Sequence, residues 1–155
     1  MRIVVAGAGK LGYSIAELLT DDEFDVIVVE NDPKRKDVVQ NSLDVLVIEG
    51  NACSPSMFND PDIRNADVLI ACTDNDEVNM ITCMMAKNNG IKHTVARIRN
   101  VDYAVNSPDL LNNDMKIDLI LNPERITASE IDHILMTPSA LNVDDFADGK
   151  VRMFE

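Results

Sequence analysis

The sequence predicts an α/β fold: a Rossmann-type doubly wound parallel sheet, followed by the start of a second small C-terminal domain. Two observations carry this prediction. Short apolar runs alternate with segments of helical periodicity, and a GxGxxG pattern directly follows the first run. The first four runs are almost continuously apolar, which is typical of strands buried on both faces of a parallel sheet. Strands separated by helices indicate repeated βαβ units.

The expected strands, in chain order, are 3–6, 26–29, 45–48, 68–71, 94–98 and 117–121. The expected helices between and after them are 11–19, 34–41, 75–88 and 123–136. Asp32 is the expected N-cap of the second helix and Pro33 its first residue, because proline suits a first helical turn. Gly90 lies just beyond the third helix, where glycine commonly ends a helix, and Pro138 should stop the fourth.

The tail has a different pattern. Apolar segments at 141–143 and 151–154 flank Asp148-Gly149, a dipeptide typical of hairpin turns. A hairpin alone is marginally stable. We therefore expect a nucleotide-binding domain over 1–137 and, over 138–155, a linker with the first hairpin of another domain, in a chain that is a piece of something longer.

Composition narrows the classes of partner. The chain has 155 residues, 46% of them hydrophobic, and a formal net charge of −13. Such a surface repels nucleic acid and anionic lipid and attracts a partner with a basic face. Its apolar stretches fall short of the roughly 18 residues that a membrane span needs, so we expect no direct membrane insertion. Three cysteines without a CxxC pair indicate reduced thiols in the cytoplasm.

The glycine pattern predicts a phosphate-binding turn. Gly7 permits the tight turn, Gly9 lets the backbone approach a pyrophosphate, and Gly12 lets the helix pack closely. The helix N-terminus then offers free N–H groups to an anion. Glu30 ends the second strand, where a carboxylate can accept hydrogen bonds from both ribose hydroxyls and repel a 2′-phosphate, which favours NAD(H) over NADP(H). Lys10 is either a phosphate contact or a solvated side chain.

The chain lacks an evident proton-transfer pair. A dehydrogenase needs an acid or base beside the nicotinamide, yet neither Tyr13 nor Tyr103 has a lysine four residues later. His93 and His133 are isolated and are better read as structural or surface residues. This favours a binding protein, with the cofactor-binding domain of an NAD-dependent oxidoreductase as the alternative.

Three carboxylates, of Asp74, Asp76 and Glu77, cluster where the fourth strand meets its helix. They could hold a divalent cation. They are also the residues that a helix N-terminus prefers electrostatically, and this second reading is the favoured one.

Several stretches of the sequence resemble one family from end to end. They are MRIVVAGAGKLGYSIAELL at 1–19, IVVENDP at 27–33, IEGNACSP at 48–55, ADVLIACTDNDEVNMITC at 66–83, VARIRNVDY at 95–103, LILNPERITASEI at 119–131 and ALNVDDFADGKVRM at 140–153. The pattern T-x-x-D-E-x-N at 73–79 is more specific than the glycines. On these segments the chain resembles the TrkA-type potassium-uptake regulators of the KTN/RCK ligand-gating family.

The resemblance implies a set of nucleotide contacts. Gly7, Ala8, Gly9, Lys10 and Leu11 would meet the phosphates, Glu30 the adenosine ribose, Asn51, Ala52 and Cys53 the adenine, and Ala71, Thr73, Asp74 and Arg97 the other half of the ligand. Cys53 stands where the family more often has Ser or Thr. Members that favour ATP or ADP often carry Arg in place of Lys10, so ATP and ADP stay open as ligands beside NAD(H).

The resemblance also implies a partner. Such proteins are cytoplasmic homodimers or homotetramers, held at the inner face of the cell membrane by a potassium-translocating membrane subunit of the Trk type. On that reading the tail begins a C-terminal regulatory domain. The helix from Pro123 either contacts another subunit or covers the sheet edge; its apolar residues are Ile126, Ile131, Ile134 and Leu135.

Overall fold

The structure is a computed structural model that describes residues 1–104, 110–136, 143–146 and 151–154. Its contacts divide the chain into two units, Met1–Leu121 and Asn122–Glu155. The expected domain boundary between residues 137 and 138 stays a prediction.

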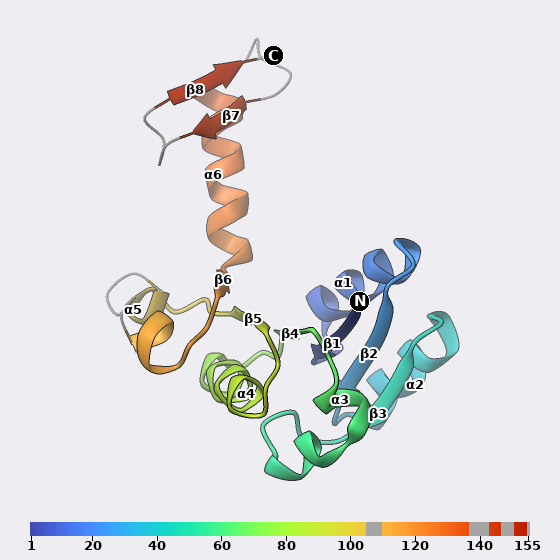
Figure 1. Ribbon diagram of the computed structural model, residues 1–155. Helices are drawn as coiled ribbons and strands as arrows, with labels where there is room; N and C mark the ends of the chain where they lie inside the picture. Colours follow the sequence, from blue (N-terminus) through green and yellow to red (C-terminus); the bar gives the residue numbers. More distant parts are fainter. Residues whose placement is uncertain (105–109, 137–142, 147–150, 155) are drawn as a thin grey trace. The chain divides into compact units, whose positions relative to one another are not determined.

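The first unit is built on a six-stranded parallel sheet. Its strands are β1 (Arg2–Ala6), β2 (Asp25–Glu30), β3 (Leu46–Glu49), β4 (Val68–Ala71), β5 (His93–Arg97) and β6 (Leu119–Leu121), in the order β3-β2-β1-β4-β5-β6 (Figure 1). All five strand pairs are parallel. This order confirms the predicted doubly wound Rossmann sheet. β6 begins two residues later than expected because the N–H of Ile117 donates to the carbonyl of Leu111, outside the sheet.

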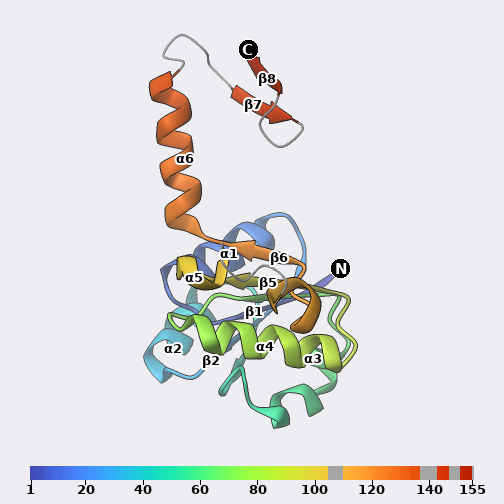
Figure 2. The ribbon, with the colours of Figure 1, turned by 90° about the vertical axis from the view of Figure 1, so that its left-hand side faces the viewer.

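Helices cover both faces of the sheet. They are α1 (Lys10–Asp21), α2 (Pro33–Ser42), α3 (Pro61–Arg64), α4 (Asp76–Asn88) and α5 (Val101–Ala104). α1 and α2 lie on one face, and α3 and α4 lie on the other (Figures 1 and 2). Alternate residues of β1 explain this arrangement: Val5 packs with Ala16 and Val39, whereas Val4 packs with Ile63 and Met80.

The sequence pattern did not predict the short helical segments. A 3-10 helix, η1 (Pro55–Asn59), and α3 fill the connection between β3 and β4, and a π-helix, η2 (Leu110–Asp114), precedes β6. They are too short to show a helical period. Phe58 and Ile63 nevertheless anchor the β3–β4 connection, because they are only 2% and 1% exposed.

The second unit contains α6 (Pro123–Met136) and an antiparallel pair, β7 (Val143–Phe146) and β8 (Val151–Phe154). This pair confirms the predicted hairpin strands, although the first strand runs over 143–146 rather than 141–143. The Asp148-Gly149 turn and Pro138 lie outside the described residues.

α6 presents a long apolar face. It has no buried residue, and its apolar side chains are 50–71% exposed: Ile126, Ile131, Ile134, Leu135 and Met136. Among the described residues, no helix has both the length and the apolar character needed to cross a bilayer.

Candidate functional site

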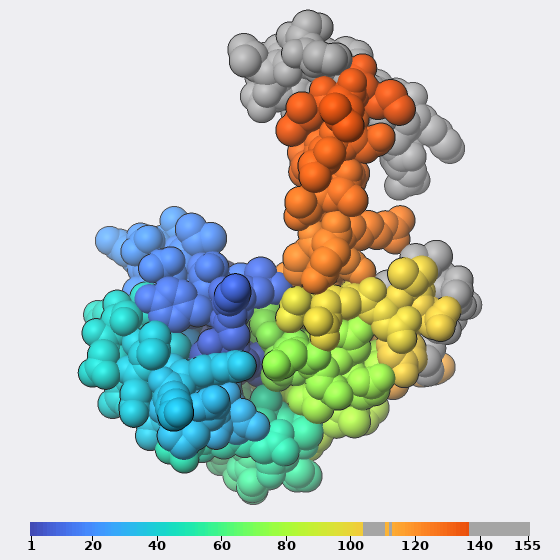
Figure 3. Space-filling view, turned by 180° about the vertical axis from the view of Figure 1, so that it is seen from behind, coloured from blue at the N-terminus to red at the C-terminus, as the bar shows by residue number. Residues whose placement is uncertain are grey.

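A pocket lies at the edge of the sheet where the parallel strands end. It is lined by the loops after β1, β2, β3 and β4, by the end of β2 and by the first turns of α2 and α4. The lining residues are Gly7, Gly9, Val29, Glu30, Asn31, Arg35, Gly50, Asn51, Ala52, Thr73, Asp74, Asn75 and Val78. Figure 3 shows the blue, cyan and green surfaces of α1, α2 and α4 around a recess. The volume is about 250 Å³, below the roughly 300–1,000 Å³ usual for small-molecule sites. A ligand as long as a dinucleotide would extend past its rim.

The glycine turn has a separate physical reason at each position. Gly7 has a φ of +99°, and a Cβ on it would lie 3.0 Å from the Thr73 nitrogen. A Cβ on Gly12 would overlap the carbonyl oxygen of Gly7. Gly9 is different, because a Cβ there would meet only Arg35, at 3.8 Å. The surface above Gly9 is therefore the most open of the three, and the expected approach of a pyrophosphate to this backbone stays a prediction.

Unlike the N-termini of α2 and α4, the N-terminus of α1 leaves its N–H groups open to an anion. Its N-cap, Gly9, makes no side-chain hydrogen bond, and its first turn carries no acidic residue. The helices that follow β2 and β4 are instead capped, by Asp32 and Asn75 respectively. Because the first N–H groups of a helix lack partners within it, α1 offers donors and the positive end of its dipole to the pocket.

Glu30 is a buried carboxylate, only 4% exposed. Its Oε2 accepts the Ala8 N–H at 2.6 Å, and its Oε1 accepts the N–H groups of Asn31 and Asp32 at 2.8 and 2.9 Å. A carboxylate has about four acceptor positions, so about one remains for a ligand. Glu30 therefore holds the glycine loop against the β2–α2 turn and keeps about one acceptor position open, so the expected contact with the ribose stays a prediction.

The opposite wall of the pocket is held by the amide of Asn79, which is fully buried. Its Oδ1 accepts the N–H and the hydroxyl of Thr73 at 2.9 and 2.7 Å. Its Nδ2 donates to the carbonyls of Thr73 and Arg97 at 3.2 and 2.8 Å. One side chain thus ties the β4–α4 loop to the end of β5, which gives the T-x-x-D-E-x-N pattern a structural reason.

Two residues of the acidic cluster at the start of α4, Asp76 and Glu77, are bonded to the protein itself, whereas Asp74 lines the pocket. Asp76 Oδ2 accepts the N–H groups of Arg99 and Asn100 at 2.9 and 2.8 Å. Glu77 accepts a hydrogen bond from the Tyr103 hydroxyl, and this bond raises the pKa of Tyr103. Over the part of the chain that the structure describes, no group of three or more His, Cys, Asp or Glu residues could hold a metal ion.

The structure distributes the predicted contact residues over two hollows. Gly7, Gly9, Glu30, Asn51, Ala52, Thr73 and Asp74 line the pocket. Ala8, Gly9 and Lys10 line a shallower groove between α1 and α2, together with Tyr13, Ser14, Arg35 and Val38. Leu11, Cys53, Ala71 and Arg97 are among the lining residues of neither.

Those four residues lie behind or beside the pocket. Ala71 is fully buried in β4, and the backbone of Leu11 belongs to the first turn of α1. The N–H and Sγ of Cys53 both donate to Asn51 Oδ1 at 3.1 Å, so Cys53 orients a residue that lines the pocket. Arg97 reaches the carbonyl of Thr73 through Nη1 at 3.5 Å, behind the β4–α4 loop.

Sequence reasoning missed six lining residues. They are Val29, Asn31, Arg35, Gly50, Asn75 and Val78. Most are chain neighbours of predicted residues, and the rule that loops at the carboxyl ends of strands line the crevice could have included them. Arg35 lies inside α2 and carries no local signal.

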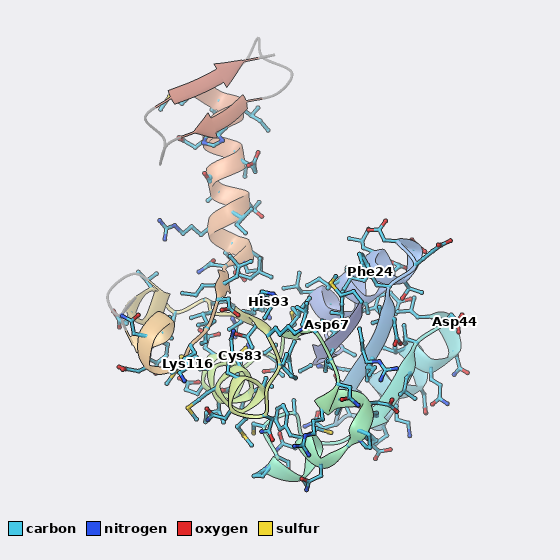
Figure 4. All side chains as sticks on the ribbon, in the orientation of Figure 1. Phe24, Asp44, Asp67, Cys83, His93 and Lys116 are labelled. Carbon is cyan, nitrogen blue, oxygen red and sulfur yellow. The ribbon has the colours of Figure 1, made fainter. Side chains whose placement is uncertain are left out.

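The remaining chemically active side chains lie elsewhere. His93 begins β5 and Asp67 directly precedes β4, so both are at the amino ends of the strands, opposite the pocket (Figure 4). Cys83, also labelled there, belongs to α4 and is buried in the core, and burial raises the pKa of its thiol to about 12. Burial likewise raises the pKa of the Cys72 thiol to about 11, which leaves both thiols poor nucleophiles.

Residues 3–123 match the TrkA-N domain. The chain belongs to the TrkA-N domain family. Except for Arg2, the match covers the six strands of the sheet, and it includes every residue that lines the pocket, so both belong to the family's domain.

Relatives of this TrkA-N domain chain include a Trk system potassium uptake protein trkA homolog 1 from Methanosarcina mazei. It is 42% identical, over 100% of this chain and 39% of the relative. The chain thus spans well under half the length of that protein. Two solved structures share the fold: the TrkA-N domain of inner membrane protein ybaL from Escherichia coli (TM-score 0.74, 18% identity, 86% of this chain and 95% of the other) and a GsuK channel bound to NAD (TM-score 0.73, 13% identity, 95% and 25%).

Proposed function

We propose that this chain is an NAD(H)-binding regulatory domain of a potassium-uptake system and that it acts by binding rather than by catalysis. The observation that carries the proposal is the convergence of an uncapped helix N-terminus, an open Gly9 and the buried Glu30 carboxylate on one pocket. The trkA homologue that the chain resembles is named a potassium uptake protein, and a GsuK channel of the same fold is described as bound to NAD.

In the proposed complex, the ligand's diphosphate lies at Gly7, Ala8, Gly9, Lys10 and Leu11. One ribose hydroxyl donates to the remaining acceptor position of Glu30. Asn51, Ala52 and Cys53 border the adenine, and Ala71, Thr73, Asp74 and Arg97 border the other half of the ligand. ATP and ADP are the alternative ligands, because they share the adenosine and a phosphate chain.

The proposed partner is a potassium-translocating membrane subunit of the Trk type, approached from the cytoplasmic face. The net charge of −13 favours a basic surface on that partner. The exposed apolar face of α6 favours self-association into a homodimer or homotetramer, since large exposed apolar patches mark interaction sites. A ligand would then shift the equilibrium between two assembly states by its difference in affinity for them.

Titration calorimetry on the 155-residue chain tests the proposal with NADH, NAD, NADPH, ATP and ADP. We expect NADH to bind at least about tenfold more tightly than NADPH, a difference of about 1.4 kcal/mol, because the Glu30 carboxylate repels a 2′-phosphate. Absence of binding by all five ligands would refute the proposed site. Steady oxidation of NADH with candidate substrates would instead favour the cofactor domain of an NAD-dependent oxidoreductase.

A further inference from the structure

Arg35 belongs to a different element from the glycine loop, yet its guanidinium lies over that loop. It lies in the first turn of α2, and its Nη1 is 3.8 Å from the place that a Cβ on Gly9 would take. Arg35 lines the pocket with Glu30 and also lines the neighbouring groove with Lys10. It therefore stands where the two hollows meet, above the most open backbone of the turn.

The guanidinium is only weakly held by the protein. Its Nε lies 4.0 Å from Asp32 Oδ2, and the side chain is 47% exposed. The other carboxylate oxygen of Asp32 caps α2 by accepting the N–H of Lys34 at 2.8 Å. Within the described residues, the Nη groups of Arg35 have no hydrogen-bond acceptor. An anion above Gly9 would give them one without breaking a strong contact.

Charge gives a reason for a cation at this place. The chain has a formal net charge of −13, and the pocket is already lined by two acidic residues, Glu30 and Asp74. A phosphate chain entering it would be repelled unless a local positive group offset those charges. Arginine suits this task because its planar guanidinium can donate two parallel hydrogen bonds to phosphate oxygens.

We propose that Arg35 is a phosphate-binding residue of this site and donates from its guanidinium to the diphosphate of a nucleotide that rests on Gly9. This inference rests on the proposed function. It adds a clamp from α2 that faces the N–H groups of α1, so that the diphosphate is held between two elements. Affinity then depends on the phosphates as well as on the adenosine.

The experiment compares Arg35→Gln with Lys36→Gln by titration calorimetry. Lys36→Gln removes the same charge from the same helix, but Lys36 pairs with Glu49 at 2.8 Å, away from the pocket. We expect Arg35→Gln to weaken NADH and ADP by about tenfold or more and to leave adenosine unchanged. The affinity for NADH and ADP should also depend less on salt than in the wild-type protein, because one screened charge pair is removed. Arg35→Lys should recover part of the loss, because it restores the charge but not the paired donors.

The other outcomes distinguish failure of the inference about Arg35 from failure of the proposed function. If wild-type protein binds NADH and Arg35→Gln binds it as tightly as Lys36→Gln does, Arg35 is not a phosphate ligand and the proposed function stands. A loss confined to NADPH would place Arg35 at the 2′-phosphate and overturn the inference. An equal loss for adenosine would show that Arg35 does not act through phosphate. If wild-type protein binds no nucleotide, the proposed function and this inference both fall.

Discussion

Each wall of the pocket is held by one buried side chain that makes several hydrogen bonds, but the two side chains differ in charge. On the β1–β2 side, a charged side chain, Glu30, accepts three backbone N–H groups and also lines the pocket. On the β4–β5 side, a neutral side chain, Asn79, makes four hydrogen bonds and is not among the lining residues. Each ties together two loops that are distant in the sequence.

The difference separates binding from support. A buried side chain that faces the pocket can hold the loop and meet the ligand with the same atoms, so its loss affects both. A buried side chain behind the wall can affect the ligand only through the shape of the loop it supports. A variant of Glu30 should therefore lose both stability and affinity for the ligand. A variant of Asn79 should lose mainly stability.

The largest expected effect is on stability in Asn79→Ala. The substitution removes the Asn79 partner of the Thr73 N–H and of the Arg97 carbonyl, and unpaired buried backbone groups are costly. We expect the free energy of unfolding to fall by about 3 kcal/mol, measured by urea denaturation. Asn41→Ala is the matched control, since Asn41 is exposed and donates to Asp37. Equal losses in the two variants would contradict the supporting role of Asn79.

The next largest expected effect is a loss of affinity for NADH in Glu30→Gln. The amide nitrogen of Gln cannot accept the Ala8 N–H, so stability should fall by about 2 kcal/mol, and NADH should bind about tenfold more weakly. Glu49→Gln is the control, because Glu49 pairs in register with Glu30 on the neighbouring strand but is exposed. NADH affinity that matches the control would remove Glu30 from the ligand's contacts.

The smallest effect is local and concerns Cys72, which directly precedes Thr73. Its pKa of about 11, raised by burial, keeps it protonated and unreactive at pH 8. Loosening the β4–α4 loop exposes the thiol, brings its pKa back toward about 8.5 and increases the reactive thiolate. Labelling followed by peptide mass spectrometry should show severalfold faster modification of Cys72 in Asn79→Ala. The same rate increase in Glu30→Gln would mean that the two walls open together.

Local patterns predicted the parts of this molecule that depend on chain neighbours. Apolar runs located every strand of the sheet, and the glycine spacing with Glu30 located the turn. Contacts between distant segments could not be predicted from local patterns, because the folded chain sets them. Examples are the hydrogen bond between Glu30 and Ala8, the position of Arg35 above Gly9 and the four hydrogen bonds of Asn79. Short helices such as α3 escaped because four residues show no period.

The turn between β1 and α1 is held at Gly7, Ala8 and Gly12 before a ligand arrives. The Gly7 N–H donates to the Val29 carbonyl at 2.8 Å, the Ala8 N–H donates to Glu30, and Gly12 lies directly against the Gly7 carbonyl. Such a segment has little conformational entropy left to lose, so ordering it adds little to the cost of binding. It can anchor a ligand but has little freedom to move in response. Any change of shape caused by the ligand must therefore begin in the other loops of the pocket.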